Sequence, residues 1–161
     1  MVRRADVRRV RRAKPSQWET KLRTIIAAAV LVAGGAAAPA LAQDAAAGEE
    51  LFARRCATCH MIVSPSGETI VRGGKTGPNQ YGVIGRTAGG RDDFNRYGDA
   101  LKAAGEQGLV WTEDLVIDYV QDPRGFLRDY LDDDGARSRM AYRLRDETDA
   151  ANVAAYLAQF D

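Results

Sequence analysis

The chain has 161 residues, with 23 lysines and arginines against 22 aspartates and glutamates, so its formal charge is +1. Residues 1–42 hold 9 of the basic and 2 of the acidic side chains, which leaves 14 basic and 20 acidic ones, a net charge of −6, on residues 43–161. An acidic stretch of 119 residues has the size of one small domain and argues against nucleic acid as its partner.

The first 42 residues have the pattern of a secretory signal peptide. Residues 1–24 are rich in arginine and lysine, residues 25–38 are apolar and rich in alanine, and residues 40–42 (ALA) match the small-x-small pattern that signal peptidase cuts. We expect cleavage after Ala42 and export to the periplasm, with residues 43–161 as the mature domain. A retained membrane anchor and a buried helix are the alternatives, although this proline-interrupted run would make a poor spanning helix.

The first part of the mature chain predicts one short helix followed by a long irregular stretch. Residues 48–55 read as a helix that leads into the cysteines, with Leu51 and Phe52 on its apolar face. Residues 62–99 are rich in glycine, proline, asparagine and threonine and show little periodicity. A loop of this length is unusual in a compact domain unless it wraps around something.

The second part predicts more helices. Thr112 is a candidate N-cap for a helix that ends at Pro123, a second short helix is expected to reach about Tyr130, and residues 132–135 form a turn. From Asp146 the apolar residues fall at helical spacing. No segment alternates long enough to predict a sheet. The apolar side chains are too few for the long loops to pack on one another, so we expect a large apolar cofactor at the centre.

Both cysteines and the single histidine lie within residues 56–60, CATCH. Cys56 and Cys59 are spaced to add to the two vinyl groups at one edge of a porphyrin, and His60 then follows as an iron ligand. A disulfide would close a very small loop and stabilise little, a zinc site needs four ligands, and a thioredoxin-like pair needs a βαβ setting. The run therefore predicts one covalently attached haem c.

The ligand on the other side of the iron can be histidine, methionine, cysteine, tyrosine, lysine or water. No second histidine or spare cysteine exists, and of the three methionines Met1 lies in the leader and Met61 is adjacent to His60. Met140 remains, in an irregular polar stretch between arginines, with Lys75 and Lys102 as fallback ligands. A methionine packed in a core or on the surface is the ordinary alternative.

A histidine and a methionine together fill both axial positions and leave no place for a substrate. This arrangement predicts a one-electron carrier and not an enzyme. If Met140 is not an iron ligand, the alternative is a ligand-binding or peroxidatic haem protein, and if the leader is retained, it is a membrane-anchored carrier.

Five motifs occur in order: CATCH (56–60), KTGPNQYGVIGRTAG (75–89), GLVWTEDLVIDYVQDP (108–123), RSRM (137–140) and DAANVAAYLAQF (149–160). With these motifs the mature chain resembles the class I c-type cytochromes, most closely the cytochromes c2 of purple bacteria. The resemblance implies an all-α fold, a small shell wrapped around one covalently attached haem.

The resemblance also implies roles for individual residues. Pro78 matches the proline whose carbonyl accepts a hydrogen bond from the iron-bound imidazole. Arg86, Tyr97 and Trp111 match groups that meet a buried haem propionate, and Tyr119 matches a tyrosine packed near the methionine sulfur.

Two further matches and two departures concern packing. Gly48 and Phe52 match the point where the first helix crosses the last. Tyr142 stands where many relatives keep a phenylalanine, and Ser138 stands where some relatives keep a threonine that hydrogen-bonds nearby.

Six arginines surround the two ligand segments: Arg54, Arg55, Arg137, Arg139, Arg143 and Arg145. Solvated surface arginines are the ordinary interpretation, but in an acidic domain their grouping predicts a basic docking face that steers encounter with an acidic partner. By resemblance, the chain is a monomeric, soluble periplasmic carrier. Its donor would be a membrane quinol–cytochrome c oxidoreductase of the bc1 type, and its acceptor a photosynthetic reaction centre or a terminal oxidase.

Overall fold

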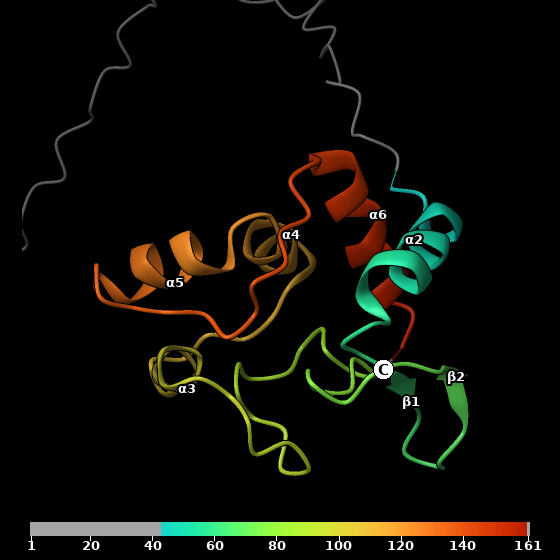
Figure 1. Cartoon of the computed structure of the whole chain (residues 1–161), viewed down its shortest axis with the longest axis horizontal. Helices are drawn as coiled ribbons and strands as arrows, with labels where there is room; N and C mark the ends of the chain where they lie inside the picture. The colour runs from blue at the N-terminus through green and yellow to red at the C-terminus, as the bar shows by residue number, and fades with distance from the viewer. Residues whose placement is uncertain (1–42, 161) are drawn as a thin grey trace, which may run out of the picture. The chain divides into compact units, whose positions relative to one another are not determined.

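The computed structural model describes residues 43–160, so the predicted signal peptide lies outside the described residues. In chain order the elements are helix α2 (Ala45–Leu51), the π-helix η1 (Phe52–Cys56), strands β1 (Ile62–Val63) and β2 (Thr69–Val71), and helices α3 (Asp99–Glu106), α4 (Glu113–Gln121), α5 (Pro123–Leu131) and α6 (Glu147–Leu157) (Figure 1). None of the helices within residues 43–160 is long and apolar enough to cross a membrane.

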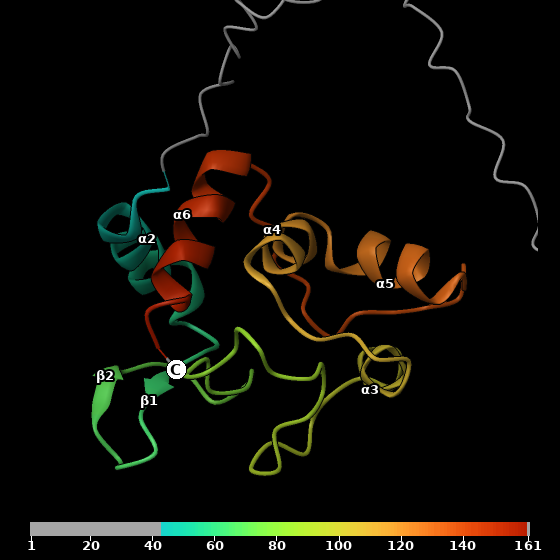
Figure 2. The ribbon, with the colours of Figure 1, turned by 180° about the vertical axis from the view of Figure 1, so that it is seen from behind.

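Helices α2 and α6 cross in close contact, as the two opposite views show (Figures 1 and 2). Gly48 makes the close approach possible, because a Cβ built there would overlap the Asn152 carbonyl and lie 2.9 Å from Cβ of Tyr156. Next to this point the rings of Phe52 and Tyr156 pack with centroids 5.9 Å apart. The prediction that Gly48 and Phe52 mark the crossing of the first and last helices is therefore confirmed.

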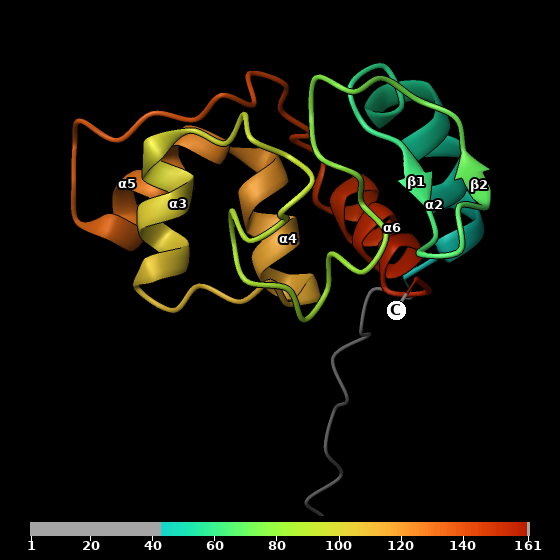
Figure 3. The same cartoon turned by 90° about the horizontal axis from the view of Figure 1, so that it is seen from below.

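Helix α5 packs against both α3 and α4, and α4 also packs against α6, so α4 connects the two groups of helices (Figure 3). The core of this half is aromatic. The centroid of Trp111 lies 5.0 Å from that of Tyr119 and 5.9 Å from that of Phe126, and Phe126 stacks on Tyr130 at 6.1 Å. These rings connect Trp111, two residues before α4, to both α4 and α5.

The expected helix boundaries in this half are largely found. Thr112 caps α4 by accepting a hydrogen bond from the Leu115 amide at 3.3 Å. Helix α4 stops before Pro123, as expected, and Pro123 is also the first residue of α5. Asp122 caps α5, because its carboxylate accepts a hydrogen bond from the Gly125 amide at 3.1 Å. A proline in the first turn of a helix loses no hydrogen bond, because its amide would have no partner there.

Two elements were not predicted. The antiparallel hairpin of β1 and β2 pairs only two and three residues, which is too few to give a period-two pattern. Helix α3 begins after Gly98 without a side-chain cap. The described chain is nevertheless mostly helical, and its long loop is held in place by the contacts described next.

Candidate haem site

The two cysteines and the histidine lie on one tight turn. η1 ends at Cys56 with a wide turn in which the Ala57 amide donates to the Phe52 carbonyl at 2.9 Å. The Cys56 carbonyl then accepts from the amides of Cys59 and His60 at 3.0 and 2.9 Å. Residues three and four apart on such a helical turn share one face. The fold therefore presents both thiols and the imidazole in the same direction.

Both thiols are free within the described chain, Cys59 being exposed and Cys56 half-buried. Burial, and to a smaller degree the neighbouring Cys59, raises the pKa of Cys56 to about 11, so its sulfur stays a neutral thiol at pH 7. No disulfide connects the two. This arrangement suits attachment to a bound group better than a redox-active pair, which needs a thiolate of low pKa.

The His60 ring is held by one backbone contact and one glycine. Its Nδ1 lies 2.8 Å from the carbonyl oxygen of Pro78, and a Cβ at Gly77 would overlap the ring, 2.5 Å from Nδ1. Burial lowers the pKa of the imidazole, and the Pro78 contact opposes this shift. A neutral ring with its hydrogen on Nδ1 leaves the lone pair of Nε2 available to a metal. The contact is the one that the resemblance implied for Pro78.

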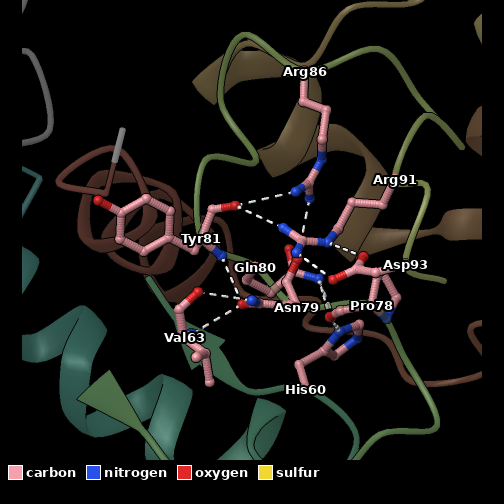
Figure 4. Close-up of polar contacts among 9 residues, drawn as sticks. All are labelled: His60, Val63, Pro78, Asn79, Gln80, Tyr81, Arg86, Arg91 and Asp93. Atoms are coloured by element: carbon pink, nitrogen blue, oxygen red, sulfur yellow. Dashed lines mark hydrogen bonds and ion pairs between the residues drawn. The ribbon is translucent and has the colours of Figure 1, made fainter. Parts of the chain in front are cut away.

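The loop that carries Pro78 is anchored to the hairpin and to the cysteine turn (Figure 4). Asn79 accepts from the Val63 amide at 3.0 Å and donates to the Val63 carbonyl at 2.8 Å. The Gly77 amide donates to the Cys59 carbonyl at 2.9 Å. These bonds fix the position of the Pro78 carbonyl relative to His60.

Two arginines brace the same loop from the other side (Figure 4). Arg86 donates to the carbonyls of Tyr81 and Asn79 at 3.1 and 3.3 Å, and Arg91 donates to Tyr81 at 3.5 Å while pairing with Asp93. Burial lowers the pKa of Arg86. A partly desolvated guanidinium with donors to spare is a suitable partner for an anionic group.

The three residues predicted to meet a propionate are partly brought together. The Trp111 amide donates to the Arg86 carbonyl at 2.9 Å, so these two residues are neighbours. Tyr97 is buried, which raises the pKa of its phenol, and the nearby guanidinium of Arg86 opposes this shift. A role for these three side chains at a propionate stays a prediction.

Met140 is tied to Tyr119 through Ser138. The Met140 amide donates to Oγ of Ser138 at 3.0 Å, and the hydroxyl groups of Ser138 and Tyr119 are 3.1 Å apart. Tyr119 packs edge-on against Trp111, and burial raises the pKa of its phenol. The half-buried Met140 thus lies on a loop held against the aromatic core, and its binding to iron stays a prediction.

The donors suit haem iron better than a bare metal ion. Within residues 43–160 no group of three or more histidine, cysteine, aspartate or glutamate side chains is placed to hold a metal. The two predicted ligands, His60 and Met140, would supply one imidazole and one thioether, too few donors for a bare ion. They would be enough for an iron atom that a porphyrin already holds.

The six arginines of the predicted docking face are exposed, but two have acidic partners. Arg54 pairs with Glu50 at 3.1 Å, and Arg143 pairs with Asp122 at 2.9 Å. Such exposed pairs contribute little to stability, yet each offsets one positive charge of the face. The basic docking face stays a prediction.

Sequence reasoning gave no role to four residues around His60: Gly77, Asn79, Gln80 and Arg91. The first two belong to the GPN segment, where a glycine before a proline and an asparagine at a loop anchor could have been singled out. No sequence signal marked Gln80 or Arg91, because their contacts depend on how the loop folds back.

Known proteins identify the family, although no family model matches the chain. Cytochrome c-551 of Roseobacter denitrificans is 57% identical over 132 residues, covering 81% of this chain and 91% of that protein. Cytochrome c2 of Cereibacter sphaeroides is 50% identical, covering 83% and 94%.

Solved structures agree. Cytochrome c2 from Rhodobacter sphaeroides superposes with a TM-score of 0.70 at 50% identity, covering 73% of this chain and 95% of that one. Cytochrome c2 from Paracoccus denitrificans gives a TM-score of 0.68 at 43% identity, covering 72% and 94%. The predicted cytochrome fold, the covalent haem c at Cys56 and Cys59, and electron transfer instead of enzymatic activity are thereby confirmed. The chain belongs to the class I c-type cytochromes, in the cytochrome c2 group.

Proposed function

We propose that this cytochrome is a soluble periplasmic one-electron carrier whose iron is bound by His60 on one side and Met140 on the other. The observation that carries the proposal is the 2.8 Å contact between Nδ1 of His60 and the Pro78 carbonyl, which leaves Nε2 for the metal. The link from Met140 through Ser138 to Tyr119 supports a fixed position for the second ligand.

In this proposal the haem supplies a reversible one-electron couple, and the protein keeps its surroundings constant. Pro78 holds the imidazole in one tautomer and strengthens its donation. Arg86 and Tyr97 supply donors for a propionate, whose charge would be costly to bury alone. With His60 and Met140 both bound to the iron, no position on it would be open to a substrate.

The partners follow from membership of the cytochrome c2 group. The proposed donor is a membrane quinol–cytochrome c oxidoreductase, and the proposed acceptor is a photosynthetic reaction centre or a terminal oxidase. Docking would use the arginines around the ligand segments, of which Arg55, Arg137, Arg139 and Arg145 are exposed and have no ion pair within the described chain. Charge complementarity of this kind acts mainly on the association rate.

Stopped-flow electron transfer to a purified reaction centre or oxidase at several salt concentrations tests the docking face. Arg139→Glu should lower the second-order rate at low salt and flatten its salt dependence. Arg72→Glu, at an exposed arginine after the hairpin, makes the same charge change elsewhere. An equal loss in both variants would show that net charge matters and not the proposed face.

The leader is tested separately. Intact mass of the protein purified from the periplasm should match a chain that starts at Gln43 and carries one haem. A mass that includes residues 1–42 would contradict cleavage and favour a membrane-anchored carrier.

A further inference from the structure

The side-chain amide of Gln80 contacts both members of the His60–Pro78 hydrogen bond (Figure 4). Its Nε2 lies 2.8 Å from Nδ1 of His60 and 3.1 Å from the Pro78 carbonyl oxygen, while those two atoms are themselves 2.8 Å apart. All three residues are half-buried. Three polar atoms thus form a closed triangle, and the number of hydrogens available decides which bonds exist.

With Nε2 of His60 bound to iron, the single hydrogen of the neutral ring is on Nδ1 and points at the Pro78 oxygen. Nδ1 then has no lone pair for Gln80, so the amide hydrogen also goes to that oxygen, which can accept two bonds. The opposite amide orientation would leave two acceptor oxygens 3.1 Å apart to share the single Nδ1 hydrogen, whereas in the structure Nε2 of Gln80 donates to the Pro78 oxygen. The haem-bearing protein therefore has two donors converging on one carbonyl.

A carbonyl that already accepts one hydrogen bond is a weaker acceptor for a second, because each bond draws on the same oxygen charge. The hydrogen bond that the His60 ring donates to this carbonyl raises the basicity of the imidazole and its electron donation to iron. Competition from Gln80 for the Pro78 carbonyl weakens this electron donation. Ferric iron is then less stabilised, so the reduction potential rises. The positive end of the Gln80 amide dipole also faces the ring and acts in the same direction.

We propose that Gln80 is a positioning residue that raises the reduction potential by competing with His60 for the Pro78 carbonyl. The inference rests on the proposed function, through His60 as an iron ligand. Hydrogen bonding beyond the ligands is one of the ways a protein sets a haem potential.

Gln80→Met tests this directly, since methionine has a similar length and volume but no N–H. In the haem-bearing variant the midpoint potential should fall, with the reduction equilibrium constant shifted three- to tenfold toward the oxidised form, tenfold being about 59 mV for one electron. In the reduced state the NMR signal of the His60 Nδ1–H should move downfield as its bond to Pro78 strengthens. Gln80→Glu, whose carboxylate can only accept from Nδ1–H, should lower the potential further.

Gln121→Met is the matched control, because Gln121 has no hydrogen bond to His60 or Pro78 within the described chain; its potential should stay at the native value. An equal or higher potential in Gln80→Met, with the axial-ligand bands of the absorption spectrum unchanged, would overturn the inference and leave the proposed function intact. If the variants do not fold, the NMR spectrum of the native reduced protein tests the inference instead. A cross-peak between the Gln80 amide hydrogens and the His60 Nδ1–H supports the competition, and its absence overturns it.

Discussion

Replacing Gly48 by alanine tests the packing that holds the two ends of the chain together. The new Cβ would overlap the Asn152 carbonyl oxygen and lie 2.6 Å from its carbon and 2.9 Å from Cβ of Tyr156. Two of these three atoms are backbone, so the contact cannot be relieved by a rotamer change. The helices α2 and α6 must move apart.

The size of the effect follows from three contributions. Forcing a methyl group into a packed contact costs about 1–3 kcal/mol. Moving α6 also strains the bond in which the Asp44 amide donates to Oδ1 of Asn152 at 2.8 Å, worth about 1 kcal/mol. The higher helix propensity of alanine offsets about 1 kcal/mol of this loss. The net loss is about 1–3 kcal/mol, or about 4–12 °C in Tm for a domain of this size.

Urea unfolding of the haem-bearing protein, followed by circular dichroism, measures this loss, provided the denaturant slope is unchanged. Ala46→Gly is the control, because Ala46 is an exposed position in the first turn of the same helix and glycine keeps its amide bond to Asp44. At position 46 the glycine variant should be less stable than the alanine protein by at most about 1 kcal/mol, which is the opposite order to position 48. A Gly48→Ala protein more stable than the native one would refute the close crossing.

Two further predictions concern the ligand loop and pH. Gly77→Ala should push the His60 ring away from Pro78, destabilise the fold by about 1–3 kcal/mol and shift the absorption bands of the haem; an unchanged spectrum and urea midpoint would count against the fit of ring and glycine. The Gly125 amide, and to a lesser degree Arg143, lowers the pKa of Asp122. The charged carboxylate therefore stabilises the fold at pH values above the ordinary aspartate pKa of about 3.9. This stabilisation is lost as the pH falls through the lowered pKa of Asp122 in the folded protein. Asp122→Asn should therefore be less stable at pH 7, and the gap should close as the pH falls below this lowered pKa, as urea midpoints along a pH series would show. A gap that stays the same down to the acid end of the series contradicts this.

Features carried by local chemistry could be predicted from the sequence. The spacing of Cys56, Cys59 and His60 requires only one turn of chain, and the cap at Thr112 acts within three residues. Pro78 was assigned by resemblance, and its carbonyl does meet the imidazole. In each case the partners are close in the chain or belong to a motif with one known geometry.

Features that depend on the folded loop could not be predicted. The hairpin is too short for periodicity and is held by Asn79, sixteen residues away from its partner Val63. Gln80 reaches His60 only after residues 72–80 fold back over the cysteine turn. Such contacts reflect tertiary packing, which leaves no repeat in the local sequence.

The most direct test of the account is the second iron ligand, measured in Met140→Ala. The native oxidised protein should show the weak far-red band of an iron–thioether bond. The variant should lose this band, bind cyanide rapidly and have a lower midpoint potential, since methionine ligation raises the potential. An oxidised spectrum and a midpoint potential that stay the same after the substitution would contradict coordination by His60 and Met140.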